Sequence, residues 1–236
     1  MIIWCYDGTF EGFLSLVSES YTQKTVPDLI TSDVSSASLL DERIWIETDE
    51  AVARRVAMSL NERFSKEALQ RLRYAFLCDD SAPERDLLLY IRLGFKSPEF
   101  LEDFAHPIVY AVHGYERRLL STLHKMNAYL RFEELEDKTL YARIAPPRNV
   151  LPLMGGHFRK RLRGENFIIY DTARSIALLH RESNIEMMRV SSIESPTFSE
   201  EEASFQNLWK TFFNSVAIES RINPSLQRSH VPIKYR

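Results

Sequence analysis

Apolar residues follow two different periods along this chain, and these periods predict its secondary structure. The opening run Ile2–Tyr6 is apolar throughout, as in a buried strand, and Asp7-Gly8 after it is a turn signal. The segment Arg43–Glu47 predicts a second strand. Much of the remaining chain up to residue 127 has apolar positions three and four residues apart, which is the period of an amphipathic helix.

The helices of this first half begin at residues whose side chains can cap a helix N-terminus. The predicted starting points are Thr9, Thr48 or Asp49, Ser65 and Ser81-Ala82-Pro83-Glu84, and a further helix is expected over residues 107–127. The first half of the chain is therefore predicted to be rich in helix.

The second half changes to an alternation between two faces, which is typical of strands. The predicted strands are residues 129–134, Leu140–Ile144, and an antiparallel pair of Phe167–Tyr170 and Ser175–His180 joined by Asp171–Arg174. A helix is predicted over residues 149–163, with Gly164 as its C-terminal stop.

A last helix over residues 200–221 has the clearest local signals. Ser199 and Glu202 form a capping-box pair at its start. An apolar stripe with helical spacing follows, and we expect it to belong to the core. The stripe consists of Phe205, Leu208, Trp209, Phe212, Phe213 and Val216.

Together these elements predict an α+β fold, with a helix-rich first half and a mostly antiparallel sheet in the second half. The sheet is expected over residues 128–180, packed against the helices at 149–163 and 200–221. We expect two parts, residues 1–105 and residues 106–236, which could also form one compact unit.

Charge is unevenly distributed along the chain, whose formal net charge is only -3. Residues 1–155 hold 18 Lys and Arg against 24 Asp and Glu, a net charge of -6. Residues 156–236 hold 12 Lys and Arg against 9 Asp and Glu, a net charge of +3. The C-terminal third is therefore the better candidate for binding an anionic partner.

The chain has only two cysteines, Cys5 and Cys78, and both lie among apolar residues. We expect buried, reduced thiols rather than a disulfide framework, which favours a cytoplasmic protein. No Cys or His spacing predicts a metal site or a bound cofactor. No apolar run approaches the length of a membrane span.

Several segments together carry a family resemblance. They are YDGTFEGFLSLV, LRFEELEDKTLYARIAPPRNVLPLMGGHFRKRL, FIIYDTARSIALLH and LWKTFFNSVAIESRINPSLQRSHVPIKYR. In their order and spacing they resemble a bacterial domain-of-unknown-function family linked to DNA metabolism and repair. Members of that family are typically encoded beside a radical-SAM protein with helix-hairpin-helix features, and some are fused to a uracil-DNA glycosylase-type domain.

The resemblance implies a nucleic-acid context, DNA in the first place, and a radical-SAM protein as partner. It does not supply catalytic residues. The chain lacks the cysteine triad of radical-SAM enzymes, so such chemistry would belong to the partner.

Three residues are candidates for general acid–base catalysis, namely His124, His157 and Asp171. Imidazole titrates near neutral pH, and a His–Asp pair brought together by folding could move a proton. The alternative is structural, because a histidine at helical spacing is often a packing residue and Asp171 lies in a turn. Asp7, at the end of a strand, has the same two interpretations, since an Asp-Gly turn explains it without chemistry.

A basic run in the predicted helix at 149–163 is the candidate nucleic-acid site. It consists of Arg159, Lys160, Arg161 and Arg163, and the tail adds Arg228, Lys234 and Arg236. Such cations could neutralise backbone phosphates. They could equally form a solvated helix end, because cations at a helix C-terminus are stabilising by about 0.3–1 kcal/mol without any ligand.

Three functions are therefore compatible with the sequence. The first is an accessory nucleic-acid-binding protein of DNA metabolism that acts with a partner enzyme. The second is an enzyme acting on a nucleobase through His124, His157 or Asp171. The third is a protein-interaction scaffold whose acidic first two-thirds binds the partner.

Overall fold

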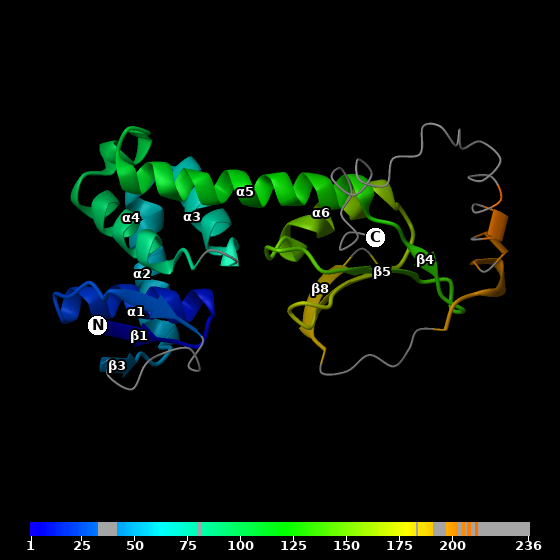
Figure 1. The fold of residues 1–236 in the computed structure, drawn as a ribbon, viewed down its shortest axis with the longest axis horizontal. Helices are drawn as coiled ribbons and strands as arrows, with labels where there is room; N and C mark the ends of the chain where they lie inside the picture. The colour runs from blue at the N-terminus through cyan, green and yellow to red at the C-terminus, as the bar shows by residue number, and fades with distance from the viewer. Residues whose placement is uncertain are drawn as a thin grey trace. The chain divides into compact units, whose positions relative to one another are not determined.

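The computed structural model describes residues 1–32, 42–79, 82–182, 184–190, 197–202, 204–205, 207–208 and 211. Its helices and two sheets confirm the predicted α+β class (Figure 1). Contacts divide the chain into two compact units, residues 1–120 and residues 121–236. The division falls within one long helix, α5 (Pro107–Tyr129), whereas the sequence prediction places its boundary before that helix.

The first unit contains a three-stranded parallel sheet. β1 (Ile2–Cys5) is its central strand, between β2 (Leu29–Thr31) and β3 (Glu42–Trp45). β1 and β3 confirm the two strands predicted in this half. β2 was not predicted, because three residues are too few to establish a period of two.

Helices make up the rest of the first unit. They are α1 (Phe10–Thr22), α2 (Glu50–Arg63), α3 (Lys66–Phe76), α4 (Glu84–Lys96), the 3-10 helix η2 (Pro98–Glu102) and the start of α5. The side chains of Thr9, Asp49 and Ser65 each accept a hydrogen bond from a backbone N–H of the first turn, which confirms these predicted caps. Ser81, the predicted start of α4, lies outside the described residues.

The core of this unit forms where α1 and α4 pack with the central strand. Trp4, Phe13 and Tyr90 are fully buried there. Cys5 and Cys78 are buried and are not joined by a disulfide, as expected from their apolar neighbours.

The second unit contains a five-stranded sheet in the order β4-β5-β6-β7-β8. Its strands are β4 (Glu133–Glu134), β5 (Leu140–Ile144), β6 (Phe167–Asp171), β7 (Ile176–Arg181) and β8 (Asn184–Arg189). Only β5 and β6 pair in parallel, so the predicted mostly antiparallel sheet is confirmed.

Two strand predictions in this unit differ from the structure. The strand expected over residues 129–134 is reduced to Glu133–Glu134, because α5 continues through Tyr129. Leu130 N still donates a helical hydrogen bond to Met126 O at 3.0 Å, and burial of both apolar side chains favours the helix. β8 was not predicted, because its largely exposed, mixed residues show no clear alternation.

Helix α6 (Leu151–Arg161) confirms the helix predicted over 149–163 and packs against the sheet of this unit. Phe158 of α6 meets Phe167 of β6 with ring centroids 6.4 Å apart, and Phe132 lies 5.2 Å from Phe158. These three aromatic rings form the centre of the second core.

The segment after β8 begins a helix at the predicted place. Ser199 Oγ accepts a hydrogen bond from Glu202 N at 3.1 Å, which is one half of the predicted capping box. The Glu202 carboxylate, however, accepts from the backbone N–H of Glu134 instead of closing back on Ser199. The helix start is thereby joined to β4.

The expectation that the apolar stripe of this helix is core is wrong for its two described members. Phe205 is 65% exposed and Leu208 is 68% exposed. The other members, Trp209, Phe212, Phe213 and Val216, lie outside the described residues, as does the rest of the expected helix to residue 221. Within the part of the chain that the structure describes, no helix combines the length and the apolar character needed to cross a membrane.

Candidate nucleic-acid interface

Helix α6 presents one apolar side to the sheet of the second unit. Gly155 and Phe158 are buried on this side. A Cβ atom on Gly155 would lie 3.1 Å from a side-chain atom of Leu178 and equally close to Ile185. Glycine therefore lets the backbone of α6 approach β7 and β8 closely, and this contact fixes which side of the helix remains in solvent.

The solvent side carries three of the predicted basic residues, Arg159, Lys160 and Arg161, and Arg163 follows two residues after the helix ends; we call the four the α6 cluster. All four side chains are exposed. Arg161 Nη1 is 3.5 Å from the backbone oxygen of Asn127 in α5, at the limit of a hydrogen bond. The other three have no hydrogen-bond or ion-pair partner among the described residues, so they are available to an anion.

The position of the cluster at the end of α6 has an electrostatic cause of its own. The last carbonyl groups of a helix carry partial negative charge, which favours nearby cations. Gly164, with φ of +85°, turns the chain away directly after the helix. The next acidic residue, Glu165, is exposed and forms no ion pair with the cluster in the described structure.

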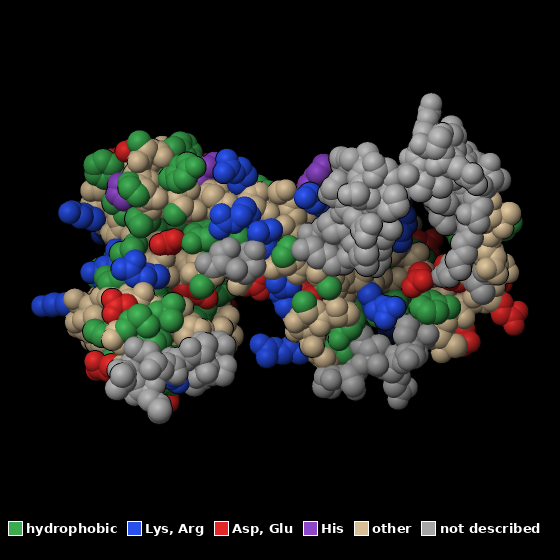
Figure 2. Space-filling view, viewed as in Figure 1, with side chains coloured by type: hydrophobic (Ala, Val, Ile, Leu, Met, Phe, Trp, Pro, Cys, Tyr) green, Lys and Arg blue, Asp and Glu red, His purple; other side chains and the backbone are tan. Residues whose placement is uncertain are grey.

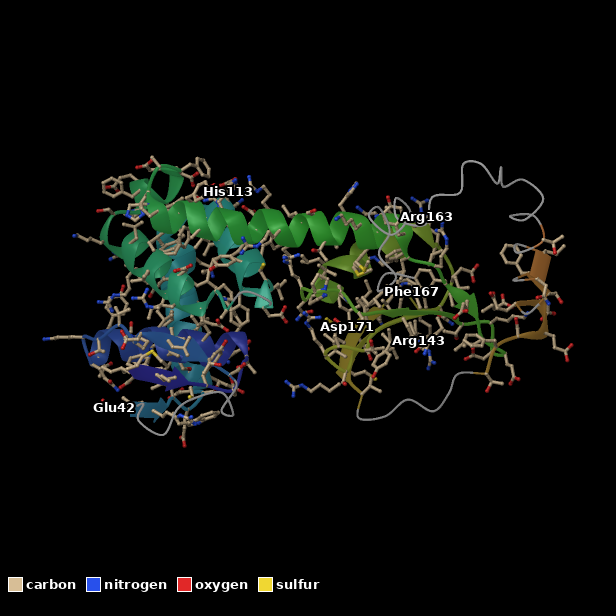
Figure 3. All side chains as sticks on the ribbon, in the orientation of Figure 1. Glu42, His113, Arg143, Arg163, Phe167 and Asp171 are labelled. Carbon is tan, nitrogen blue, oxygen red and sulfur yellow. The ribbon has the colours of Figure 1, made fainter. Side chains whose placement is uncertain are left out.

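The α6 cluster and Asp171 belong to different ends of the sheet. In Figure 3 the label of Phe167, the first residue of β6, lies between those of Arg163 and of Asp171, the last residue of that strand. Four residue steps along a strand span about 13 Å. A small ligand bound at Arg163 would therefore not reach Asp171.

His124 and His157 are exposed side chains on α5 and α6. The ring of His157 meets that of Phe158 edge-on, with centroids 4.9 Å apart. Neither histidine shares a hydrogen bond with the other or with Asp171 among the described residues. The catalytic role of these three residues stays a prediction.

Asp171, the last residue of β6, is fully buried and is paired with the turn that follows it. Its carboxylate accepts hydrogen bonds from Arg174 Nη1 and from Ala173 N, both at 3.0 Å. Arg174 also donates to the carbonyl oxygens of Pro146 and Pro147, at 3.1 and 3.2 Å. Burial raises the pKa of Asp171, and the positive charge of Arg174 opposes that rise. The pair joins the β6–β7 turn to the loop that follows β5.

Asp7, the other carboxylate singled out from the sequence, is also held by neighbouring groups. It accepts hydrogen bonds from Thr9 N at 2.9 Å, Thr9 Oγ1 at 2.7 Å and Thr48 Oγ1 at 2.8 Å. Desolvation works to raise the pKa of Asp7, but these hydrogen bonds outweigh it and lower the pKa. Asp7 therefore links the end of β1 to the start of α1 and to the segment after β3.

A buried histidine was missed by the sequence analysis. His180 of β7 stacks on Phe167 with ring centroids 4.7 Å apart and an interplanar angle of 16°. Its Nδ1 is 3.0 Å from the backbone oxygen of Glu165, while Nε2 is buried without a hydrogen-bond partner. The alternation along Ser175–His180 is the signal that places His180 on the inner face of the sheet.

Two further sequence predictions can be compared with the structure only in part. Among the described residues, no group of three or more His, Cys, Asp or Glu side chains is arranged to hold a metal ion. The predicted cations of the tail, Arg228, Lys234 and Arg236, lie outside the described residues.

The fold and this surface define an α+β protein with a basic helix end in its second unit. Residues 82–236 match the model of a family described as a domain of unknown function, DUF4130. The match covers more than half of the chain, so the chain belongs to this family. No curated protein and no solved structure matches it.

Proposed function

We propose that this chain binds nucleic acid through the α6 cluster, as a cytoplasmic accessory protein of DNA metabolism that acts with a radical-SAM protein. The observation that carries the proposal is the exposure of four adjacent cations, three of them without a partner among the described residues. The DNA context and the radical-SAM partner come from the family resemblance of the sequence.

The contact we propose is with the phosphate backbone. Each phosphate neutralised by Lys or Arg releases condensed counterions, so the affinity falls steeply with salt. The net charge of the chain, -3, opposes approach from a distance. At about 0.15 M salt, however, the screening length is about 8 Å, so a local cluster can act despite acidic residues elsewhere.

The test replaces Arg159, Lys160, Arg161 and Arg163 together by Ala and measures binding to a labelled DNA duplex over a range of salt concentrations. If all four contact phosphates, the slope of log K against log salt becomes shallower by about 3.6. At about 50 mM salt the variant binds more weakly, and the difference shrinks at about 200 mM salt.

A matched control removes four exposed cations elsewhere, none of which has a partner among the described residues. It replaces Arg54, Lys66, Arg73 and Arg117 by Ala in the first unit. The control changes the net charge equally, so it separates a local contact from a general effect of charge. Equal salt slopes for both variants, or no DNA binding by the unaltered chain at low salt, would refute the proposal.

The partnership requires a separate experiment. Sedimentation of a mixture of this chain and a radical-SAM protein of the kind that the family resemblance implies should give a complex heavier than either protein. If the two sediment independently, with and without DNA, direct partnership is excluded while DNA binding can still hold.

A further inference from the structure

Two adjacent hollows in the first unit share a pair of aromatic side chains. The first, of about 410 Å³, lies between α1 and α2, and the second, of about 510 Å³, lies between α4 and the start of α5. Tyr21 of α1 and Phe95 of α4 line both. Each volume is within the range of about 300–1,000 Å³ that is usual for small-molecule sites.

The charged groups that line these hollows are all of one sign. Arg55 and Arg63 line the first, and Arg92 and Lys96 line the second, with His106 beside them. No Asp or Glu lines either hollow, although the first 155 residues carry a net charge of -6. Lys and Arg side chains (blue) stand among apolar ones on the face of this unit seen in Figure 2.

The aromatic pair is held in place by the arginines around it. The rings of Tyr21 and Phe95 meet at 84° with centroids 6.2 Å apart. The guanidinium of Arg92 lies 4.6 Å from the centre of the Tyr21 ring and is fixed by two 3.1 Å hydrogen bonds to Ser20. Arg63 Nη1 donates to the backbone oxygen of Phe95 at 3.3 Å.

Two cations and one ring therefore remain available to a ligand. Arg55 and Lys96 have no hydrogen-bond or ion-pair partner among the described residues, and Lys96 and Arg55 are both exposed. Tyr21 is 44% exposed despite its contacts with Arg92 and Phe95. Burial raises the pKa of Tyr21 and Arg92 opposes this, so the phenol remains neutral and its ring can stack.

We propose that these hollows bind a nucleotide of single-stranded nucleic acid, with the base stacked on Tyr21 and the flanking phosphates near Arg55 and Lys96. An aromatic surface between free cations is the combination that binds single strands without sequence preference. The acidic surroundings restrict binding to this site, because repulsion from neighbouring carboxylates disfavours phosphates elsewhere on the unit. The inference depends only on residues 1–120 and stands apart from the α6 cluster.

The test uses a short labelled oligothymidylate as the probe and a Tyr21→Leu variant, which keeps an apolar side chain but removes the ring. Stacking of one base contributes about 1–3 kcal/mol, so the variant should bind roughly 5- to 150-fold more weakly. Tyr110→Leu is the matched control, because Tyr110 is 66% exposed on α5 and lines neither hollow. Equal affinity of the two variants would overturn the proposal.

A second pair of variants examines the phosphates. Replacing Arg55 and Lys96 together by Ala should make the salt slope for the oligothymidylate shallower by about 1.4, whereas replacing Lys66 and Arg73 should leave it unchanged. Each pair removes two cations, so net charge is matched. If the two pairs change the slope equally, the hollows do not hold the phosphates.

Competition experiments distinguish single-stranded nucleic acid from free nucleotides and from simple anions. A combined variant distinguishes the hollows from the α6 cluster. If AMP displaces the labelled oligothymidylate as effectively as unlabelled oligothymidylate does, the site binds free nucleotides and the single-strand proposal is overturned. Equal displacement by inorganic polyphosphate would show an anion site without base stacking and overturn it too. In the α6 cluster variant, the effect of Tyr21→Leu should persist, because it arises in the first unit.

Discussion

Gly12 of α1 lies directly against the carboxylate of Asp7, so that a Cβ atom at Gly12 would overlap Asp7 Oδ1 and lie 2.7 Å from Thr48 Oγ1. Asp7 cannot easily move away, because the three hydrogen bonds from Thr9 and Thr48 fix its position. The junction between the end of β1, the start of α1 and the segment after β3 thus depends on the absence of a side chain at Gly12.

We therefore expect Gly12→Ala to lower the free energy of unfolding by about 2–4 kcal/mol, through overpacking and loss of the Asp7 hydrogen bonds. This loss exceeds the gain of about 1 kcal/mol in helix propensity that Ala brings. Urea denaturation followed by circular dichroism measures the difference.

Gly114→Ala in α5 is the control for this substitution. Only Arg118 Nη1, at 3.8 Å, would be near its Cβ atom, so Ala should raise the stability by up to about 1 kcal/mol. If Gly12→Ala and Gly114→Ala change the free energy of unfolding equally, the inference that Asp7 packs closely against Gly12 of α1 is wrong.

The buried pair of Asp171 and Arg174 gives a pH-dependent prediction. Arg174→Met should lower the free energy of unfolding by about 3–5 kcal/mol at pH 7, because the buried carboxylate of Asp171 then lacks its charged partner. Without the Arg174 side chain the pKa of Asp171 rises further above its usual value, since burial is then opposed only by backbone hydrogen bonds such as that from Ala173 N. A carboxyl group whose pKa is higher in the folded state contributes stability below its unfolded pKa and loses it as the pH rises through the folded pKa.

The difference in the free energy of unfolding between Arg174→Met and the unaltered chain should therefore shrink as the pH is lowered from 7 toward the usual pKa range of aspartate. Adding Asp171→Asn to Arg174→Met removes the titrating group, so the double variant should lose this pH dependence and be more stable at pH 7 than the single variant. Parallel pH profiles of the single and double variants would contradict the assignment.

Local signals explain how much of the fold the sequence could predict. Thr9, Asp49 and Ser65 act within three residues of their own positions, so the helix starts could be placed from sequence. β2 and β8 depend on pairing with strands that the local pattern does not specify. The start of β4 was misplaced because Leu130 suits the end of α5 as well as a strand.

The same distinction applies to the candidate sites. The basic run could be located from the sequence, but the exposure of all four side chains follows from the packing of α6 through Gly155 and Phe158. The hollows beside Tyr21 could not be located from the sequence, since Arg55, Arg92 and Tyr21 come from three helices whose packing creates the site. Asp171 was predicted as the first residue of a turn, but it is the last residue of β6, and its burial depends on the surrounding sheet.

The exposed start of the apolar stripe provides a stability comparison. Phe205→Ala and Leu208→Ala should each change the free energy of unfolding by less than about 0.5 kcal/mol, because neither side chain is buried. Phe158→Ala, in contrast, empties a site that is 1% exposed between aromatic rings and should cost about 3–5 kcal/mol. A cost at Phe205 comparable to that at Phe158 would restore the interpretation of the stripe as core.

The two adjacent glycines of α6 allow the packing of the basic helix to be tested with one methyl group. At Gly156 a Cβ atom would have no neighbour within 4 Å, so Gly156→Ala should raise the stability by about 0.5–1 kcal/mol through helix propensity alone. At Gly155 it would lie 3.1 Å from Leu178 Cδ1 and from Ile185 Cδ1, so both side chains must shift. Overpacking costs about 1–3 kcal/mol, which exceeds the propensity gain, and Gly155→Ala should therefore be destabilising.

Neither glycine substitution changes a charge of the α6 cluster, so both variants should retain the salt slope of the unaltered chain for DNA as long as they are folded. Denaturation curves and binding measurements on the same two proteins then separate the two roles of α6. Opposite signs of the stability change, with one common salt slope, would support a helix packed through Gly155 that presents its basic end to solvent. Stabilisation by Ala at both positions would mean that α6 does not approach β7 and β8 as closely as the contacts at Gly155 require.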